Sequence, residues 1–168
     1  MALSGFNHSV QWNEFRTVDR RPGGVPEDAH MTSGASTFQP IPARITGTQN
    51  CRVASAKCVI AVIRSGTWVV RGRQSADLLR HEQGHYEITA LGTRNLYNQV
   101  LRLTAPCRSL NREVQSLQRQ TNTLIAQTNI RYDLQTNHGN NATVQRTWDA
   151  RIRSAMQSAN GTLADLPQ

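Results

Sequence analysis

Two histidines four residues apart, with a glutamate directly after the first, are the residues of this chain best suited to chemistry. They lie in the segment His81-Glu82-Gln83-Gly84-His85. On a helix, residues four apart share a face, so both imidazoles can reach one zinc ion at roughly 2.0–2.1 Å. A glutamate beside the first histidine can accept a proton from a water that zinc acidifies to a pKa of about 7. The spacing therefore predicts a hydrolytic zinc site with Glu82 as general base.

A catalytic zinc site also needs a third protein ligand. The continuations typical of two large groups of zinc peptidases are missing, because position 91 is Leu91 and no glutamate stands about twenty residues after the second histidine. The remaining donors are Asp133 and His138. In an antiparallel helical hairpin, residues in the low 130s lie opposite His81, so both donors are in range. The residues alone leave the choice between them open.

The elements that must position these residues are helical. Ser75 suits a helix N-cap, and apolar residues then recur every three or four positions up to Leu103, which predicts a helix of about eight turns ending near Pro106. A second helix is expected over residues 109–136 and a third over residues 143–160. Because the link between the first two is short, they should lie antiparallel.

The first half of the chain carries strand and loop signals. Residues 8–12 alternate like a short strand, and residues 38–45 are extended in character. Residues 59–63, a turn, and residues 68–70 predict a hairpin or meander, and either strand could offer its edge to an extended peptide.

The expected fold class is therefore α+β: a small N-terminal antiparallel or mixed β-sheet, a long antiparallel helical hairpin carrying the histidines, and a C-terminal helix. We expect one domain over residues 1–168, with residues 1–74 mainly strands and loops and residues 75–168 mainly helical.

Composition and charge bear on which partners the protein could have. The net charge is +8, but the basic residues are scattered, which fits contact with an anionic surface or plain solubility. Without clusters of aromatic residues or a known reader motif, no specific nucleic acid is expected. No run approaches 18 apolar residues, so no transmembrane segment is expected. The oligomeric state is not indicated.

Cysteines and the N-terminus bear on the compartment. With Cys51, Cys58 and Cys107, at least one thiol is left over within the chain. Cys51 and Cys58 could close a small loop in an oxidising compartment, or both could be free and buried. Residues 1–8 have neither the basic nor the apolar region of a signal peptide. We therefore expect either a protein without a cleaved export signal or a chain that begins after one.

Three segments together resemble a bacterial family of predicted secreted zinc-dependent proteases, long carried as a domain of unknown function. They are Leu-Leu-Arg-His-Glu-Gln-Gly-His-Tyr-Glu-Ile at 78–88, Tyr-Asp-Leu-Gln-Thr-Asn-His-Gly at 132–139, and Gln-Arg-Thr-Trp at 145–148. The resemblance extends over about residues 9–152. It implies a zincin-like metallopeptidase domain, a metal shell completed by the 132–139 segment, and a secreted or periplasmic location.

With this resemblance, we expect His81, His85 and His138 to bind Zn²⁺. Asp133 would accept a hydrogen bond from a ligand imidazole or, alternatively, be the third ligand itself. Tyr132 is a candidate donor to the oxyanion, although ordinary packing would equally explain it. The expected function is a zinc-dependent metallopeptidase acting on a peptide or protein substrate. The alternative is a non-catalytic zinc-binding protein or a basic interaction protein.

Overall fold

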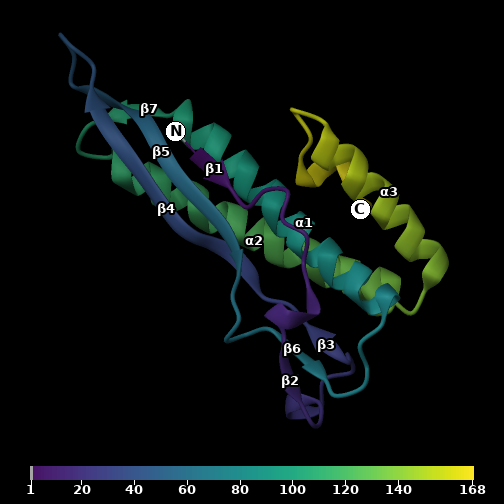
Figure 1. Ribbon diagram of the computed structural model, residues 1–168. Helices are drawn as coiled ribbons and strands as arrows, with labels where there is room; N and C mark the ends of the chain where they lie inside the picture. Colours follow the sequence, from purple (N-terminus) through teal and green to yellow (C-terminus); the bar gives the residue numbers. More distant parts are fainter. Residues whose placement is uncertain (1) are drawn as a thin grey trace.

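A long central helix, a second helix antiparallel to it, a twisted β-hairpin and a third helix make up most of the molecule (Figure 1). The computed structural model describes residues 2–168. The helices are α1 (Ala76–Leu101), α2 (Leu110–Thr136) and α3 (Ala142–Gln157), with short 3-10 turns at 12–14, 22–24 and 163–165. The strands are β1 (Ala2–Ser4), β2 (Arg16–Val18), β3 (Ala29–His30), β4 (Ser33–Arg44), β5 (Asn50–Val62), β6 (Trp68–Val70) and β7 (Thr104–Pro106). The predicted α+β class is confirmed.

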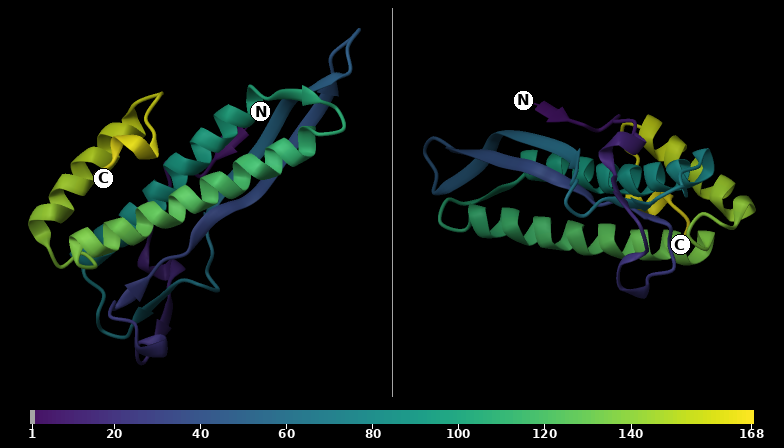
Figure 2. Two further views of the ribbon diagram at one scale, coloured as in Figure 1. Left: turned by 180° about the vertical axis from the view of Figure 1, so that it is seen from behind. Right: turned by 60° about the horizontal axis from the view of Figure 1, so that its bottom comes forward.

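Helix α1 lies at the centre because its side chains are apolar in several directions. As predicted, Ser75 is its N-cap, and the serine hydroxyl accepts a hydrogen bond from the Leu78 N–H at 3.1 Å. Figure 2 shows α1 and α2 side by side along their length, with α3 on one flank and the long hairpin of β4 and β5 on the other. Ile88 and Leu91 are fully buried among residues of α2 and α3.

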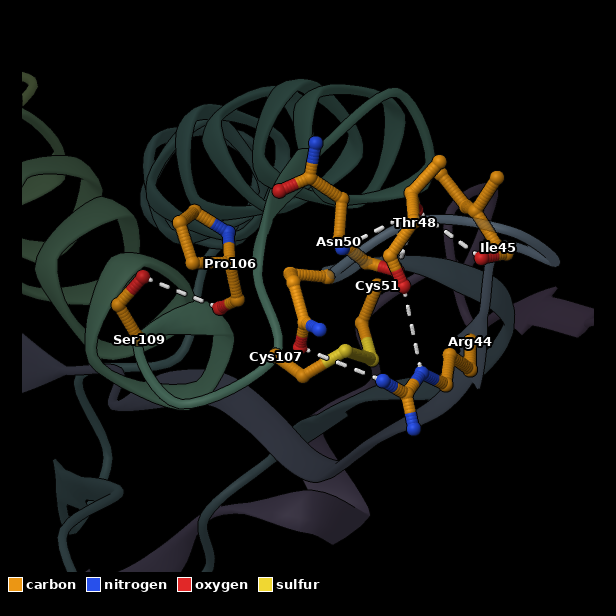
Figure 3. Close-up of a disulfide and its surroundings, with 9 residues drawn as sticks. Arg44, Ile45, Thr48, Asn50, Cys51, Pro106, Cys107 and Ser109 are labelled. Atoms are coloured by element: carbon orange, nitrogen blue, oxygen red, sulfur yellow. Dashed lines mark hydrogen bonds between the residues drawn. A yellow bond between two sulfur atoms is a disulfide. The ribbon is translucent and has the colours of Figure 1, made fainter.

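The link between α1 and α2 contains a short strand. Residues Thr104–Pro106 form β7, which pairs antiparallel with the start of β5. A disulfide joins Cys51 of β5 to Cys107, directly after β7 (Figure 3). The expectation that Cys51 and Cys58 might pair is therefore wrong. Both lie on β5, where seven residues of extended chain span roughly 23 Å, far beyond the reach of a disulfide. Cys58 is buried with a free thiol.

The larger sheet has the strand order β1-β5-β4. Strands β4 and β5 form an antiparallel hairpin with register shifts between Ala35 and Thr37 and between Ile41 and Pro42. Strand β1 is parallel to β5 on its other side. The predicted extended stretch at 38–45 is confirmed in kind, but the strand begins earlier, at Ser33. Consequently β5 is interior to this sheet, and β4 is its edge.

The smaller sheet has the order β2-β6-β3, so the hairpin expected between residues 59–63 and 68–70 is wrong. The reason is the intervening turn. The Thr67 hydroxyl donates to the Ile63 carbonyl at 2.9 Å, and the Gly66 N–H donates to the same carbonyl at 3.1 Å. The chain leaves β5 there and enters a second sheet, where β6 lies between β2 and β3.

The expected strand at residues 8–12 is also wrong. Residues 9–11 are irregular and lead into a 3-10 turn at Trp12–Glu14. The carboxylate of Glu14 accepts a hydrogen bond from the Gln11 N–H at 2.8 Å, which closes the turn. Val10 and Phe15 are buried on either side of it. The apolar residues therefore reach the core through a turn instead of a strand.

Helix α3 confirms the third predicted helix within a few residues at each end. Asn141 is its N-cap, and Trp148 and Ile152 on its inner face are fully buried against α1 and α2.

Within residues 2–168, the helices are all too short or too polar to cross a membrane.

Candidate metal centre

The antiparallel pairing of α1 and α2 brings two histidines and an aspartate to one point. His81 and His85 lie one turn apart near the start of α1, and Asp133 lies in the last turn of α2. The Oδ1 atom of Asp133 is 3.1 Å from His81 Nε2 and 3.0 Å from His85 Nε2. The two Nε2 atoms are 3.2 Å apart. Three potential ligand atoms therefore converge, as expected for residues in the low 130s opposite His81.

The spacing of these three atoms suits a small cation. Two ligands of a tetrahedral zinc ion, each about 2.0–2.1 Å from the metal, lie roughly 3.3 Å apart. The three observed separations are close to that value. His81, His85 and Asp133 thus form a group that could hold a metal ion. Imidazole nitrogen and carboxylate oxygen are ligands for zinc and for several other transition metals.

The other ring nitrogen of each histidine is occupied by an amide oxygen. His81 Nδ1 donates to Gln145 Oε1 at 3.1 Å, and His85 Nδ1 donates to Asn129 Oδ1 at 2.8 Å. An amide oxygen only accepts, so these bonds place a proton on Nδ1 and leave each Nε2 directed at the cluster. The side-chain amide of Gln145 is itself held by donating to the hydroxyl of Tyr132 at 2.6 Å.

Asn129 was not foreseen from the sequence. It lies four residues before Asp133 on α2, so the two share a helix face, and that spacing is the signal that could have found it. Asn129 and Gln145 accept from the two Nδ1 atoms, and the role of Asp133, as acceptor or as third ligand, stays a prediction. Asp133 faces the Nε2 atoms, which places it among the potential ligands.

His138 lies beside this group, in the turn that follows α2. Its Nδ1 is 3.5 Å from Asp133 Oδ1. Asn137 and His138 both have left-handed backbone, with φ of 49° and 51°, which is uncommon for residues with a side chain. Gly139 completes the turn with φ of 80°, and a Cβ there would come within 3.1 Å of His81 Cβ. The turn thus packs directly on a potential ligand. The choice of His138 as third ligand stays a prediction.

Tyr132 packs against His81. Its ring stacks on the His81 imidazole, with centroids 4.6 Å apart and planes inclined by 17°. The hydroxyl donates to the His81 carbonyl at 3.2 Å, and the side chain is fully buried. The hydroxyl hydrogen is therefore committed within the protein. This placement fits the packing interpretation of Tyr132 better than that of a donor to substrate.

The pKa values of Asp133, His85 and His81 are shifted in different directions. Burial alone would favour a neutral Asp133, but hydrogen bonds with His81 and His85 hold the pKa of its carboxyl well below the usual range. Burial likewise opposes a charge on His85, yet Asp133 and the charge of Glu82 raise the pKa of His85 to about 9. Burial lowers the pKa of His81, against the opposing effect of Asp133. A proton and a metal cation would compete for the same atoms.

Glu82 is buried next to the cluster, with 2% of its surface exposed. Among residues 2–168, no hydrogen-bond partner reaches its Oε2 atom. Burial raises the pKa of this carboxyl to about 7, although the charge of His85 opposes the shift. A buried, unpaired carboxyl oxygen is unusual, and a group that titrates near neutral pH suits proton transfer.

A cavity of about 400 Å³ opens beside the cluster, between the start of β4 and the two long helices. His85 and Asp133 line it at one end. His30 also lines it, which the sequence did not indicate. The His30 ring stacks on Trp68 at 6.2 Å, and its Nδ1 is 3.7 Å from Glu27 Oε1. A histidine in an irregular stretch fifty residues away carried no spacing signal.

Comparison with known proteins gives one match. Residues 67–139 match the model of a family described as a bacterial protein of unknown function (DUF922). Searches of curated proteins and of solved structures found no match. The matched segment is shorter than the expected resemblance over residues 9–152, but it contains β6, all of α1 with its two histidines, all of α2 and the turn through Gly139. Over residues 67–139, the chain is therefore similar to this bacterial family, whose description leaves its activity open.

Proposed function

We propose that this protein is a zinc-dependent metallopeptidase. The observation that carries the proposal is the convergence of His81 Nε2, His85 Nε2 and Asp133 Oδ1, with both Nδ1 atoms tied to amide oxygens. Held in this way, the two imidazoles direct their Nε2 atoms at one point before any metal arrives. Such preorganisation, with a buried glutamate one residue after the first histidine, matches what a hydrolytic zinc site requires.

A zinc ion bound there would supply Lewis acidity toward the substrate carbonyl and would lower the pKa of a water molecule. Glu82 accepts the proton of the attacking water and passes it to the leaving amine. Its unpartnered Oε2 supports this role, because a water molecule held there would provide the missing hydrogen bond. A carboxyl with a pKa of about 7 can both accept and donate a proton near neutral pH.

Asp133 is our choice for the third ligand, with His138 as the alternative, since Asp133 Oδ1 lies 3.1 and 3.0 Å from the two Nε2 atoms and belongs to the group of converging donor atoms. Tyr132, Gln145 and Asn129 are positioning residues that fix the imidazoles. His30 replaces Tyr132 as the proposed donor to the developing oxyanion, because it lines the cavity next to His85.

The disulfide between Cys51 and Cys107 supports a proposal for the compartment. Disulfides persist in oxidising surroundings and are rare in the reducing cytosol. We therefore place the protein, as part of the proposal, in a secreted or periplasmic setting.

The metal site is tested by elemental analysis of protein purified without added metal. The wild type should carry about one zinc per chain, as expected for a single set of three converging donor atoms. His81→Ala and Asp133→Ala should lose it, whereas His138→Ala should retain it. His8→Ala is the matched control, because His8 pairs with Glu14 away from the cluster. Zinc lost with His138→Ala and kept with Asp133→Ala would reverse the assignment of the third ligand.

Catalysis is tested with Glu82→Gln, which keeps the shape of the side chain but cannot accept the proton. Hydrolysis of an unfolded protein such as reduced casein should vanish while zinc content and folding are unchanged. Glu113→Gln, on the exposed first turn of α2, is the control.

The alternatives give different results. Zinc binding without hydrolysis by the wild type would leave a non-catalytic zinc-binding protein. Failure to bind any metal, even on addition of zinc, would leave a basic interaction protein.

A further inference from the structure

The cavity beside the metal centre continues past it in one direction. From His85 it follows the face of α1 through Thr89 to Thr93, and on the facing helix it reaches from Asp133 back to Asn122. Eight residues of helix between His85 and Thr93 span roughly 12 Å. An extended peptide advances roughly 3.3 Å per residue. The cavity therefore has room for three to four residues of extended chain on one side of the metal centre.

One wall of this cavity is a free strand edge. Residues 33–35, the first three residues of β4, line it together with the two residues before them, and β4 is the outermost strand of its sheet. Of the strands first expected to receive a peptide, the one at 68–70 lies between β2 and β3, and the one at 59–63 belongs to β5, which lies between β1 and β4 in the strand order. An edge strand presents unpaired backbone N–H and C=O groups, which an extended peptide can satisfy by adding a strand. The peptide backbone would then run along β4.

Away from His30, His85 and Asp133, the side chains that line the cavity are uncharged. Beyond His30, His85 and Asp133, no residue of the described lining is charged, although the chain as a whole carries a net charge of +8. Small and aliphatic side chains from α2 face the strand, namely Ile125, Ala126 and Ile130. Ile130 has 60% of its surface exposed. Burying an unpaired charge here would be costly, whereas covering Ile130 would be favourable.

We infer that this cavity binds an extended, uncharged peptide segment of small or aliphatic residues, on one side of the bond to be cleaved. The inference rests on the proposed peptidase function for its biological meaning. Its geometry, however, needs only the strand edge, the length of the cavity and its neutral lining. It names a substrate class that the metal centre by itself does not determine.

Peptide binding can be measured without cleavage, using zinc-loaded Glu82→Gln protein. The probe is a fluorescein-labelled peptide of eight alanine, serine and valine residues with blocked ends, followed by fluorescence anisotropy at 150 mM salt. Because every residue of the peptide is small and uncharged, each register of binding presents the same class of side chain to the cavity. Two matched peptides carry glutamate or lysine in place of every valine. Both should bind roughly tenfold more weakly than the neutral peptide.

Two variants locate the binding to this cavity. Ala126→Lys places a cation on the exposed part of the lining and should improve binding of the glutamate peptide roughly threefold to fivefold. Thr123→Lys adds the same charge to an exposed position of α2 outside the lining and should leave that affinity unchanged. Ile130→Asp should weaken the neutral peptide and, being at an exposed position, should fold normally by circular dichroism.

The outcomes separate the two proposals. Equal binding of the charged and neutral peptides, or equal effects of the two lysine variants, would overturn the substrate class. If the wild type hydrolyses casein in spite of such a result, the peptidase proposal stands and only this inference fails. If the neutral peptide binds selectively but the wild type cleaves nothing, the cavity is a peptide-binding site and the peptidase proposal fails.

Discussion

Gly84 and Tyr132 are in direct contact across the interface between α1 and α2. A Cβ on Gly84 would lie 2.7 Å from the Tyr132 ring carbon Cζ and nearer still to the hydroxyl. Glycine inside a helix costs about 1 kcal/mol relative to alanine, so a reason is needed for its presence between the two histidines. The reason is steric: only without a side chain at this position can Tyr132 stack on His81 and donate to its carbonyl.

Gly84→Ala should therefore destabilise the protein in spite of alanine's higher helix propensity. Overpacking of a rigid aromatic contact costs about 1–3 kcal/mol. The displaced Tyr132 would also loosen His81, so zinc content should fall together with the melting temperature. Adding Tyr132→Phe removes the nearest atom and should restore part of the loss. An unchanged melting temperature in Gly84→Ala would contradict the contact.

Asn129→Ala should weaken metal binding without unfolding the protein. The variant removes the acceptor that orients His85, and loss of such partners typically costs 10–100-fold in metal affinity. Competition with a chelator of known affinity measures the change. Asn111→Ala, at an exposed position near the other end of α2, is the matched control. Equal affinities for both variants would show that Asn129 does not orient the ligand.

Removal of zinc should lower the melting temperature reversibly. A ligand present at a hundredfold excess over its Kd stabilises a protein by about 2.7 kcal/mol. For a chain of this length, that corresponds to about 5–11 °C. Scanning calorimetry after chelation and after zinc is restored would measure the shift. His81→Ala should show almost none, and a full zinc-dependent shift in that variant would place the ion elsewhere.

Breaking the disulfide should cost more than any of these changes. The bond closes a loop across 56 positions of the chain, for which the entropy lost by the unfolded state predicts about 4 kcal/mol. Cys51→Ser, Cys107→Ser and the double variant should all lose about the same stability in denaturant titrations. Losses that add between the two single variants would indicate that packing, and not the bond, is responsible.

The buried thiol of Cys58 predicts a dependence on alkaline pH. Burial raises the pKa of Cys58 from 9.0 to about 11. The unfolded chain therefore loses this proton first as pH rises, so the stability that Cys58 contributes is complete below pH 9 and is lost between pH 9 and 11. The difference in unfolding free energy between wild type and Cys58→Ala should shrink across this window. Thiol reagents should label Cys58 only after unfolding, because it is wholly inaccessible in the fold.

The helical part of the fold was determined by local sequence. The Ser75 N-cap and apolar residues at three- and four-residue spacing predicted the start of α1 and the extent of α2 to within a few residues, whereas α1 ends at Leu101, earlier than the end expected near Pro106. The short link made the two helices antiparallel. From that, the meeting of His81 with residues in the low 130s followed, because a helical hairpin has one register once its link is fixed.

The strands were decided by tertiary structure. A strand's partner depends on contacts far away in sequence, so the pairing of β6 with β2 and β3, and of β7 with β5, left no local signal. The same is true of the disulfide, whose cysteines come together only because β7 pairs with β5. The free edge of β4, and with it the cavity that its first residues line, could not be read from residues 31–35 alone.

At the candidate metal centre, the sequence determined which residue types are present and the tertiary structure determined which of their atoms meet. The spacing of His81 and His85 on one helix face is local and was predictable. Which atom of Asp133 meets them, and which amides hold the outer nitrogens, depends on the rotation of α2 and α3 about their axes. That rotation is set by packing of buried residues such as Tyr132 and Trp148, which is a property of the whole core and not of any one segment.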